Sequence, residues 1–116
     1  MRIVADSNTL VSAVLWGGLP SVLLDLAKRG KLELFTSRYI LMEVDQVMRR
    51  PHFSPRVTAT GRSVAAMMRS LRLQMTRVSP ADIPPTSRDP DDDVVLATAL
   101  SAKARVIFLV IKICYA

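Results

Sequence analysis

Short segments rich in apolar residues alternate along the chain with longer stretches of helical spacing. The short segments have the length and composition of buried strands and lie at 3–5, 32–35, 73–78 and 105–111. In the stretches between them apolar residues recur every three or four positions, which predicts helices at 9–15, 20–29, 39–48, 62–73 and 91–103. This alternation predicts an α/β domain with a central, mostly parallel sheet.

Residues that favour caps and turns mark the ends of these elements. Ser7 or Asn8 can cap the first helix and Ser37 the third, because their side chains accept hydrogen bonds from backbone N–H groups. Gly30 closes the second helix. The segments 49–55 and 79–90 are predicted as loops, because prolines interrupt regular backbone hydrogen bonding in both.

The size of the chain suits one domain with its own core. It has 116 residues, of which 50% are apolar and 22% charged. Its single cysteine, Cys114, excludes a disulfide framework and a cysteine-based metal cluster, and it favours a cytoplasmic location. The longest apolar run, 106–111, is much shorter than the roughly 20 residues that cross a bilayer, so no membrane partner is expected.

The charge is strongly positive but unevenly distributed. The net charge is +6, and most of the basic residues are arginines, whose guanidinium groups match phosphate oxygens. Many small basic proteins bind no nucleic acid, so charge alone leaves this open. Five of the ten acidic residues, however, lie between 82 and 93. A basic protein with one concentrated acidic segment suggests a cation site on a polyanion-binding protein.

Two isolated acidic residues are candidates for such a site. Asp6 directly follows the first strand, at the end where α/β sheets form their sites. It is either a functional carboxylate or a turn and helix-cap residue. Glu43 shares a helix face with apolar residues, and a buried carboxylate is costly unless it is paired or binds a metal; the alternative is a position at the helix edge. Asp45 points away from that face and can pair with Arg49.

Further acidic residues, at 89 and 91–93, crowd the start of the last predicted helix. The helix dipole explains one or two of them but does not require four. Asp92 shares a face with apolar residues and is therefore the favoured ligand. Inward carboxylates without a histidine or cysteine partner suit Mg²⁺ or Mn²⁺, ions that clamp the attacking and leaving oxygens of phosphoryl transfer.

Three segments of the chain resemble the PIN-domain ribonucleases, in particular the VapC-like toxins. They are 3–8, 41–44 and 88–100, and their order and separation are similar to that family from Met1 to about Ile107. The resemblance implies a single three-layer α/β/α domain over 1–116. It also implies Mg²⁺- or Mn²⁺-dependent cleavage of single-stranded or structured RNA, and a cognate antitoxin as partner.

The same resemblance implies roles for individual residues. Asp6, Glu43 and Asp92 match the family's catalytic and metal-binding acids, and Asp93 is the nearest competitor of Asp92 as a metal ligand. Ser7 and Asn8 match small polar residues that support the site.

After about residue 108 the sequence departs from the family. Relatives place there an acidic motif that supplies a fourth acid, followed by further elements, whereas this chain has the mostly apolar 108–116. One permitted set of codons for this stretch, read in another frame, encodes a similar acidic motif. We therefore expect a truncated or frameshifted domain whose apolar tail packs in a homodimer.

These observations predict a metal-dependent endoribonuclease of the toxin type, weakened or inactive through loss of the fourth acid. The alternative is a non-catalytic PIN remnant that serves as a binding or oligomerisation module. A phosphatase of the haloacid-dehalogenase type is disfavoured because Asn8 stands where that family needs a second aspartate. A serine hydrolase is disfavoured because no motif places a histidine base beside a serine.

Overall fold

A parallel sheet forms the centre of the molecule. The computed structural model describes residues 2–81, 90–102 and 106–108, with the backbone alone at 19, 90–92 and 106–108. The strands are β1 (Arg2–Ala5), β2 (Glu33–Thr36), β3 (Thr76–Arg77) and β4 (Val106–Phe108). They pair in parallel in the order β3-β2-β1-β4, so the predicted α/β sheet is confirmed.

β1 is an inner strand of this sheet. Ile3 lies opposite Leu34 of β2 on one side and opposite Val106 of β4 on the other. Ile3, Val4 and Ala5 are all buried. A parallel strand covered on both faces is apolar along its whole length, which is why so short an apolar run predicted it.

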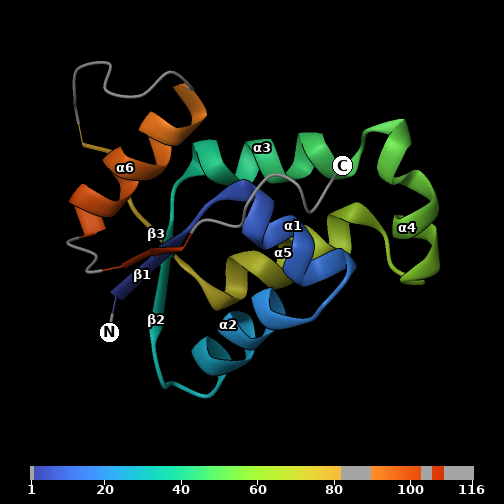
Figure 1. The fold of residues 1–116 in the computed structure, drawn as a ribbon, viewed down its shortest axis with the longest axis horizontal. Helices are drawn as coiled ribbons and strands as arrows, with labels where there is room; N and C mark the ends of the chain where they lie inside the picture. Colours follow the sequence, from blue (N-terminus) through green and yellow to red (C-terminus); the bar gives the residue numbers. More distant parts are fainter. Residues whose placement is uncertain (1, 82–89, 103–105, 109–116) are drawn as a thin grey trace.

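Helices cover both faces of the sheet and extend from its carboxyl edge. They are α1 (Ser7–Leu15), α2 (Leu19–Lys28), α3 (Arg38–Met48), the 3₁₀ turn η1 (Pro51–Phe53), α4 (Ser54–Ala59), α5 (Val64–Gln74) and α6 (Pro90–Ala102). α6 packs on one face, against β1, β2 and β4, while α2 and α5 lie on the other (Figure 1). α1 and α3 leave the carboxyl ends of β1 and β2 and pack against each other. This is the three-layer α/β/α arrangement.

The helix ends follow the capping preferences in the sequence, with one exception. The Ser37 hydroxyl accepts a hydrogen bond from the Ile40 N–H at 3.4 Å, as predicted. Gly30 follows α2 with a φ of 75°, a conformation that costs other residues strain. The predicted cap of the first helix at Ser7 or Asn8 is wrong, because α1 begins at Ser7 and the preceding Asp6 side chain caps it.

Two predicted boundaries also need correction. The segment 49–55 is not a continuous loop: η1 and the start of α4 lie within it, and each has a proline in its first turn, where the missing N–H costs nothing. The strand predicted at 73–78 is reduced to the two residues of β3, because α5 continues through Gln74.

The core lies between the sheet and the helices that leave its carboxyl edge. α3 contributes a buried stripe that includes Ile40, Val44 and Val47. α5 contributes Met67 and Met68, as well as the buried Leu71. Met67 and Met68 therefore belong to the core.

A hydrogen bond from the first strand anchors the end of the last described helix. Arg2, at the amino end of β1, donates from Nη1 to the Ala102 carbonyl oxygen at 3.0 Å. The carboxyl end of α6 is therefore held at the amino edge of the sheet. Since a 13-residue helix is about 20 Å long, the first turn of α6 lies toward the opposite, carboxyl edge.

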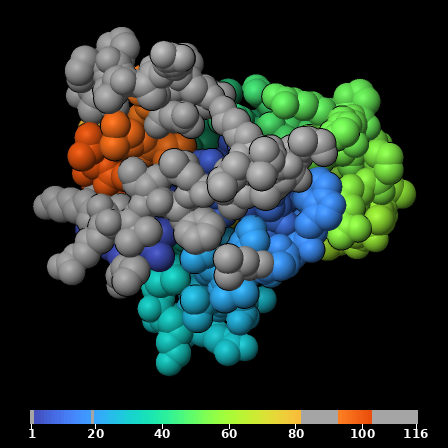
Figure 2. All heavy atoms as spheres, in the orientation of Figure 1, coloured from blue at the N-terminus to red at the C-terminus, as the bar shows by residue number. Residues whose placement is uncertain are grey.

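The η1 and α4 region lies at the other end of the molecule from α6 (Figure 2), and aromatic side chains meet there. Trp16 is 46% exposed, and its ring meets that of the buried Phe53 edge-on at 5.7 Å between centroids. The Arg56 guanidinium lies 5.7 Å from the centre of the Trp16 ring. His52 is exposed, as predicted.

Within the described ranges, no single helix is long and apolar enough to cross a membrane, and the α1–α2 pair reaches that length only across an 87° bend. The tail 109–116, on which the expected truncation and homodimer depend, lies outside the described residues.

Burial along α5 allows a matched test of the core. Leu71 is 1% exposed and Leu73, two residues further, is 83% exposed. Leu71→Ala should lower the free energy of unfolding by about 2–5 kcal/mol, because it leaves a cavity in the core. Leu73→Ala on the same helix should change it by no more than about 0.5 kcal/mol. Urea denaturation of both variants measures the difference, and equal losses would contradict this assignment of the core.

Candidate metal centre

The carboxyl edge of the sheet brings together residues that follow different strands. β1 is followed by Asp6, β2 by Ser37 and β3 by Val78. Because the strands are parallel, these positions lie along one edge, where open α/β sheets form their sites. Asp6 is 8% exposed and Ser37 is fully buried. The predicted location of Asp6 at a buried strand end is confirmed.

The Asp6 carboxylate is held by the first turn of α1. Its Oδ1 accepts a hydrogen bond from the Thr9 N–H at 2.8 Å and a second from the Thr9 hydroxyl. The helix-cap interpretation of Asp6 is therefore correct. It does not exclude the functional one, because an ionised carboxylate has two oxygens and about four lone-pair sites. The cap fixes the orientation of the group at the sheet edge.

Sequence reasoning missed Thr9 as part of this arrangement. Thr9 is buried and directs both its backbone and side-chain donors to the same Asp6 oxygen. The signal was present in the sequence as an aspartate followed three residues later by threonine, a spacing that resembles a capping box. Ser7 is buried and Asn8 half-buried in the same turn, so both predicted supporting residues lie beside Asp6 along the chain.

Glu43 lies in the second turn of α3 and is half-buried. It stands at the margin of the buried stripe of that helix, since Ile40 and Val47 are buried three residues before it and four after it. α3 packs against both α1 and α6. On the exposed side of α3, the Asp45 carboxylate pairs with the Arg49 guanidinium, which confirms the solvent-side pair predicted for these residues.

The acidic start of α6 is described in part. Asp91 and Asp92 lie in the first turn of the helix, and Asp93 follows with a half-buried side chain. α6 packs against β1, the strand that Asp6 follows, and against α3, the helix that contains Glu43. The side chains of Asp91 and Asp92 and the whole of Asp89 fall outside the described part of the chain.

The donor atoms available at this edge are oxygens. Asp6, Glu43 and Asp93 are carboxylates, and the single histidine, His52, lies on η1 at the other end of α3. Such a donor set fits a hard divalent cation chemically. Among the described side chains, no three acidic, histidine or cysteine groups are close enough to hold a metal ion. The convergence of Asp6, Glu43 and Asp92 therefore remains a prediction.

Comparison with known proteins agrees with this architecture. The PIN domain family matches residues 2–108, a range that includes Asp6, Glu43 and the acidic start of α6. No curated protein and no solved structure matches the chain. The match spans nearly the whole chain and all the described strands. The chain therefore belongs to the PIN-domain family.

Proposed function

We propose that this PIN domain is a metal-dependent endoribonuclease and the toxin of a toxin–antitoxin pair. Membership in the family indicates a nuclease-type function. The observation that carries the proposal is the buried Asp6 carboxylate, held at the carboxyl end of β1, with the acid-bearing helices α3 and α6 packed against its neighbouring elements.

Asp6, Glu43 and Asp92 would hold a Mg²⁺ or Mn²⁺ ion, with Asp93 as the nearest competitor of Asp92. When bound, such an ion supplies positive charge to the attacking and leaving oxygens of a phosphodiester and lowers the pKa of water. The contribution of Asp6 is a negative charge at a defined place, because Thr9 fixes one of its oxygens. Burial at this edge limits the access of bulk water to that charge.

The proposed role makes RNA the substrate and a cognate antitoxin the regulatory partner. The strong positive charge of the chain favours approach of a polyanion. A non-catalytic PIN remnant would retain the fold and the basic surface but would lack metal-dependent cleavage. Incubation with labelled RNA and Mn²⁺, with EDTA as control, separates the two. Cleavage that persists in EDTA, or is absent with Mn²⁺, contradicts the proposal.

Substitutions at Asp6 separate its two roles. Asp6→Asn keeps a good helix cap but removes the charge. It should lower RNA cleavage by about 100-fold or more, which exceeds the loss usually caused by residues that contact metal ligands and not the metal. The free energy of unfolding should stay close to that of the parent. Asp6→Ala should lose cleavage and also about 0.5–2 kcal/mol of stability. Cleavage rates and urea denaturation of both variants give the comparison, and an Asp6→Asn variant as active as the parent refutes the catalytic role.

Metal binding can be measured without activity. Mn²⁺ should raise the Tm of the parent, because an ion that binds only the folded state stabilises it. Glu43→Gln and Asp92→Asn should each abolish most of this shift. Asp45→Asn, on the same helix as Glu43 but paired with Arg49 on the exposed side, is the matched control and should retain it. A shift that survives in Glu43→Gln and Asp92→Asn would show that the ion binds elsewhere.

A further inference from the structure

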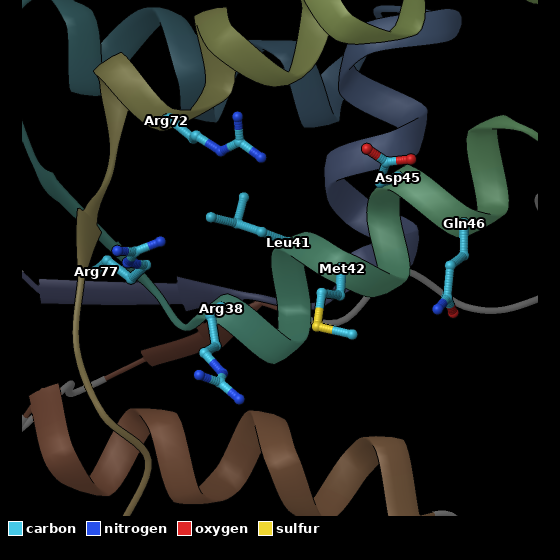
Figure 3. Close-up of a pocket in the computed structure, with 7 residues that line it drawn as sticks. All are labelled: Arg38, Leu41, Met42, Asp45, Gln46, Arg72 and Arg77. Carbon is cyan, nitrogen blue, oxygen red and sulfur yellow. The ribbon is translucent and has the colours of Figure 1, made fainter.

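A groove lies between α3, α5 and β3. It contains a hollow of about 340 Å³, lined by Arg38, Arg72 and Arg77 together with Leu41 and other α3 residues. A second hollow of about 580 Å³ shares Arg38 and Arg77 and continues along Tyr39 and 78–81. Figure 3 shows the three arginines around Leu41, one each from α3, α5 and β3. We call this the arginine groove.

The groove arginines differ from arginines elsewhere on the molecule in their partners. Several arginines elsewhere bind carboxylates or backbone carbonyls within the fold: Arg29 pairs with Asp25, Arg49 with Asp45, and Arg2 and Arg56 donate to carbonyl oxygens. Within the described residues, no carboxylate pairs with Arg38, Arg72 or Arg77. The acidic residue that lines the groove, Asp45, is neutralised by Arg49.

The groove also presents aromatic and apolar surface. Tyr39 is 47% exposed, and the Arg38 guanidinium lies 5.1 Å from the centre of its ring. The exposed Met42 and the buried Leu41 add an apolar wall and floor. Cationic side chains beside an exposed aromatic ring are typical of sites for single-stranded nucleic acid, where arginines neutralise phosphates and bases stack on the ring.

The position of the groove connects it to the candidate metal centre. Arg77 ends β3, and Arg38 begins α3 directly after the carboxyl end of β2. Both therefore lie at the carboxyl edge that also holds Asp6. The strand order β3-β2-β1 separates the end of β3 from the end of β1 by two strand spacings, about 10 Å. The arginines at the mouth of the groove thus share the edge that holds Asp6.

We propose that the arginine groove binds the single-stranded RNA that the proposed nuclease cleaves. Arg38, Arg72 and Arg77 are positioning residues that contact phosphates, and the Tyr39 ring stacks on a base. The proposal rests on the proposed function for the identity of the ligand. An acidic peptide could also pair with arginines, but it would gain little from an exposed tyrosine ring, so we favour RNA.

The test is a binding titration of a short fluorescein-labelled single-stranded RNA in EDTA, which prevents metal-dependent cleavage. Arg38→Ala, Arg72→Ala and Arg77→Ala should each weaken binding several-fold and reduce the slope of log K against log salt by about 0.7, as expected for one lost phosphate contact on a single strand. Tyr39→Ala should weaken binding about fivefold or more with little change in that slope.

The matched control is Arg50→Ala. Arg50 is exposed, has no ion pair with a described residue, and lies beyond the other end of α3, about 18 Å from Arg38 along the helix. It changes the net charge equally but should leave binding within about twofold. Circular dichroism confirms that each variant is folded. Equal losses for Arg50→Ala and the groove variants would overturn the proposal, because they would show a general charge effect.

Further outcomes distinguish failure of the groove proposal from failure of the proposed nuclease function. If RNA is cleaved with Mn²⁺ while the groove variants bind and cleave like the parent, the groove proposal fails and the proposed function stands. If no cleavage occurs but binding maps to the groove, the proposed function fails and the binding site stands. If a poly-glutamate peptide binds the parent more tightly than RNA and loses affinity in the groove variants, the groove is a peptide site and the RNA proposal is overturned.

Discussion

The candidate site depends on how the Asp6 carboxylate is held where β1 passes into α1. A carboxylate with so little exposure would be costly without hydrogen bonds. Two donors from Thr9 offset that cost, and they also begin the first helix. One side chain thus ends a strand, caps a helix and places a negative charge at the carboxyl edge. Asp6 therefore serves both the local fold and the candidate chemistry.

The candidate site also requires that the acidic first turn of α6 lie at the same edge of the sheet. The parallel order of the sheet fixes this, because a helix that leads into a parallel strand starts at the carboxyl edge and ends at the amino edge. The bond from Arg2 to the Ala102 carbonyl ties the far end of α6 to the start of β1. The start of β1 thus holds the end of α6, and the end of β1 leads directly into Asp6.

Positive charge is arranged on the neighbouring part of that edge. Asp6 follows β1 and Asp92 belongs to α6, whereas Arg77 ends β3 and Arg38 begins α3 after β2. Two strand spacings of about 10 Å are close to the Debye length at physiological salt, about 8 Å. The division of charge suits an enzyme that must attract a polyanion and also hold a cation.

Local interactions were predictable from the sequence because they act within one turn of helix or along one strand. The apolar runs located the strands, Ser37 capped its helix as expected, and the Asp45–Arg49 pair formed as expected at four-residue spacing. Prediction from local sequence failed where neighbouring residues could each cap the same helix. Asp6 rather than Ser7 caps α1, because the Thr9 donors reach the Asp6 oxygen.

The sequence by itself singled out Asp6, Glu43 and Asp92 as candidates, because each follows an apolar strand or shares a helix face with apolar residues. Only the tertiary structure decided that Arg38, Arg72 and Arg77 share one groove. They come from α3, α5 and β3, and nothing in the spacing of residues so far apart reports their proximity. Their meeting depends on β3 pairing with β2 and on α5 packing against α3 and β3, which are long-range choices made by burial of the whole core.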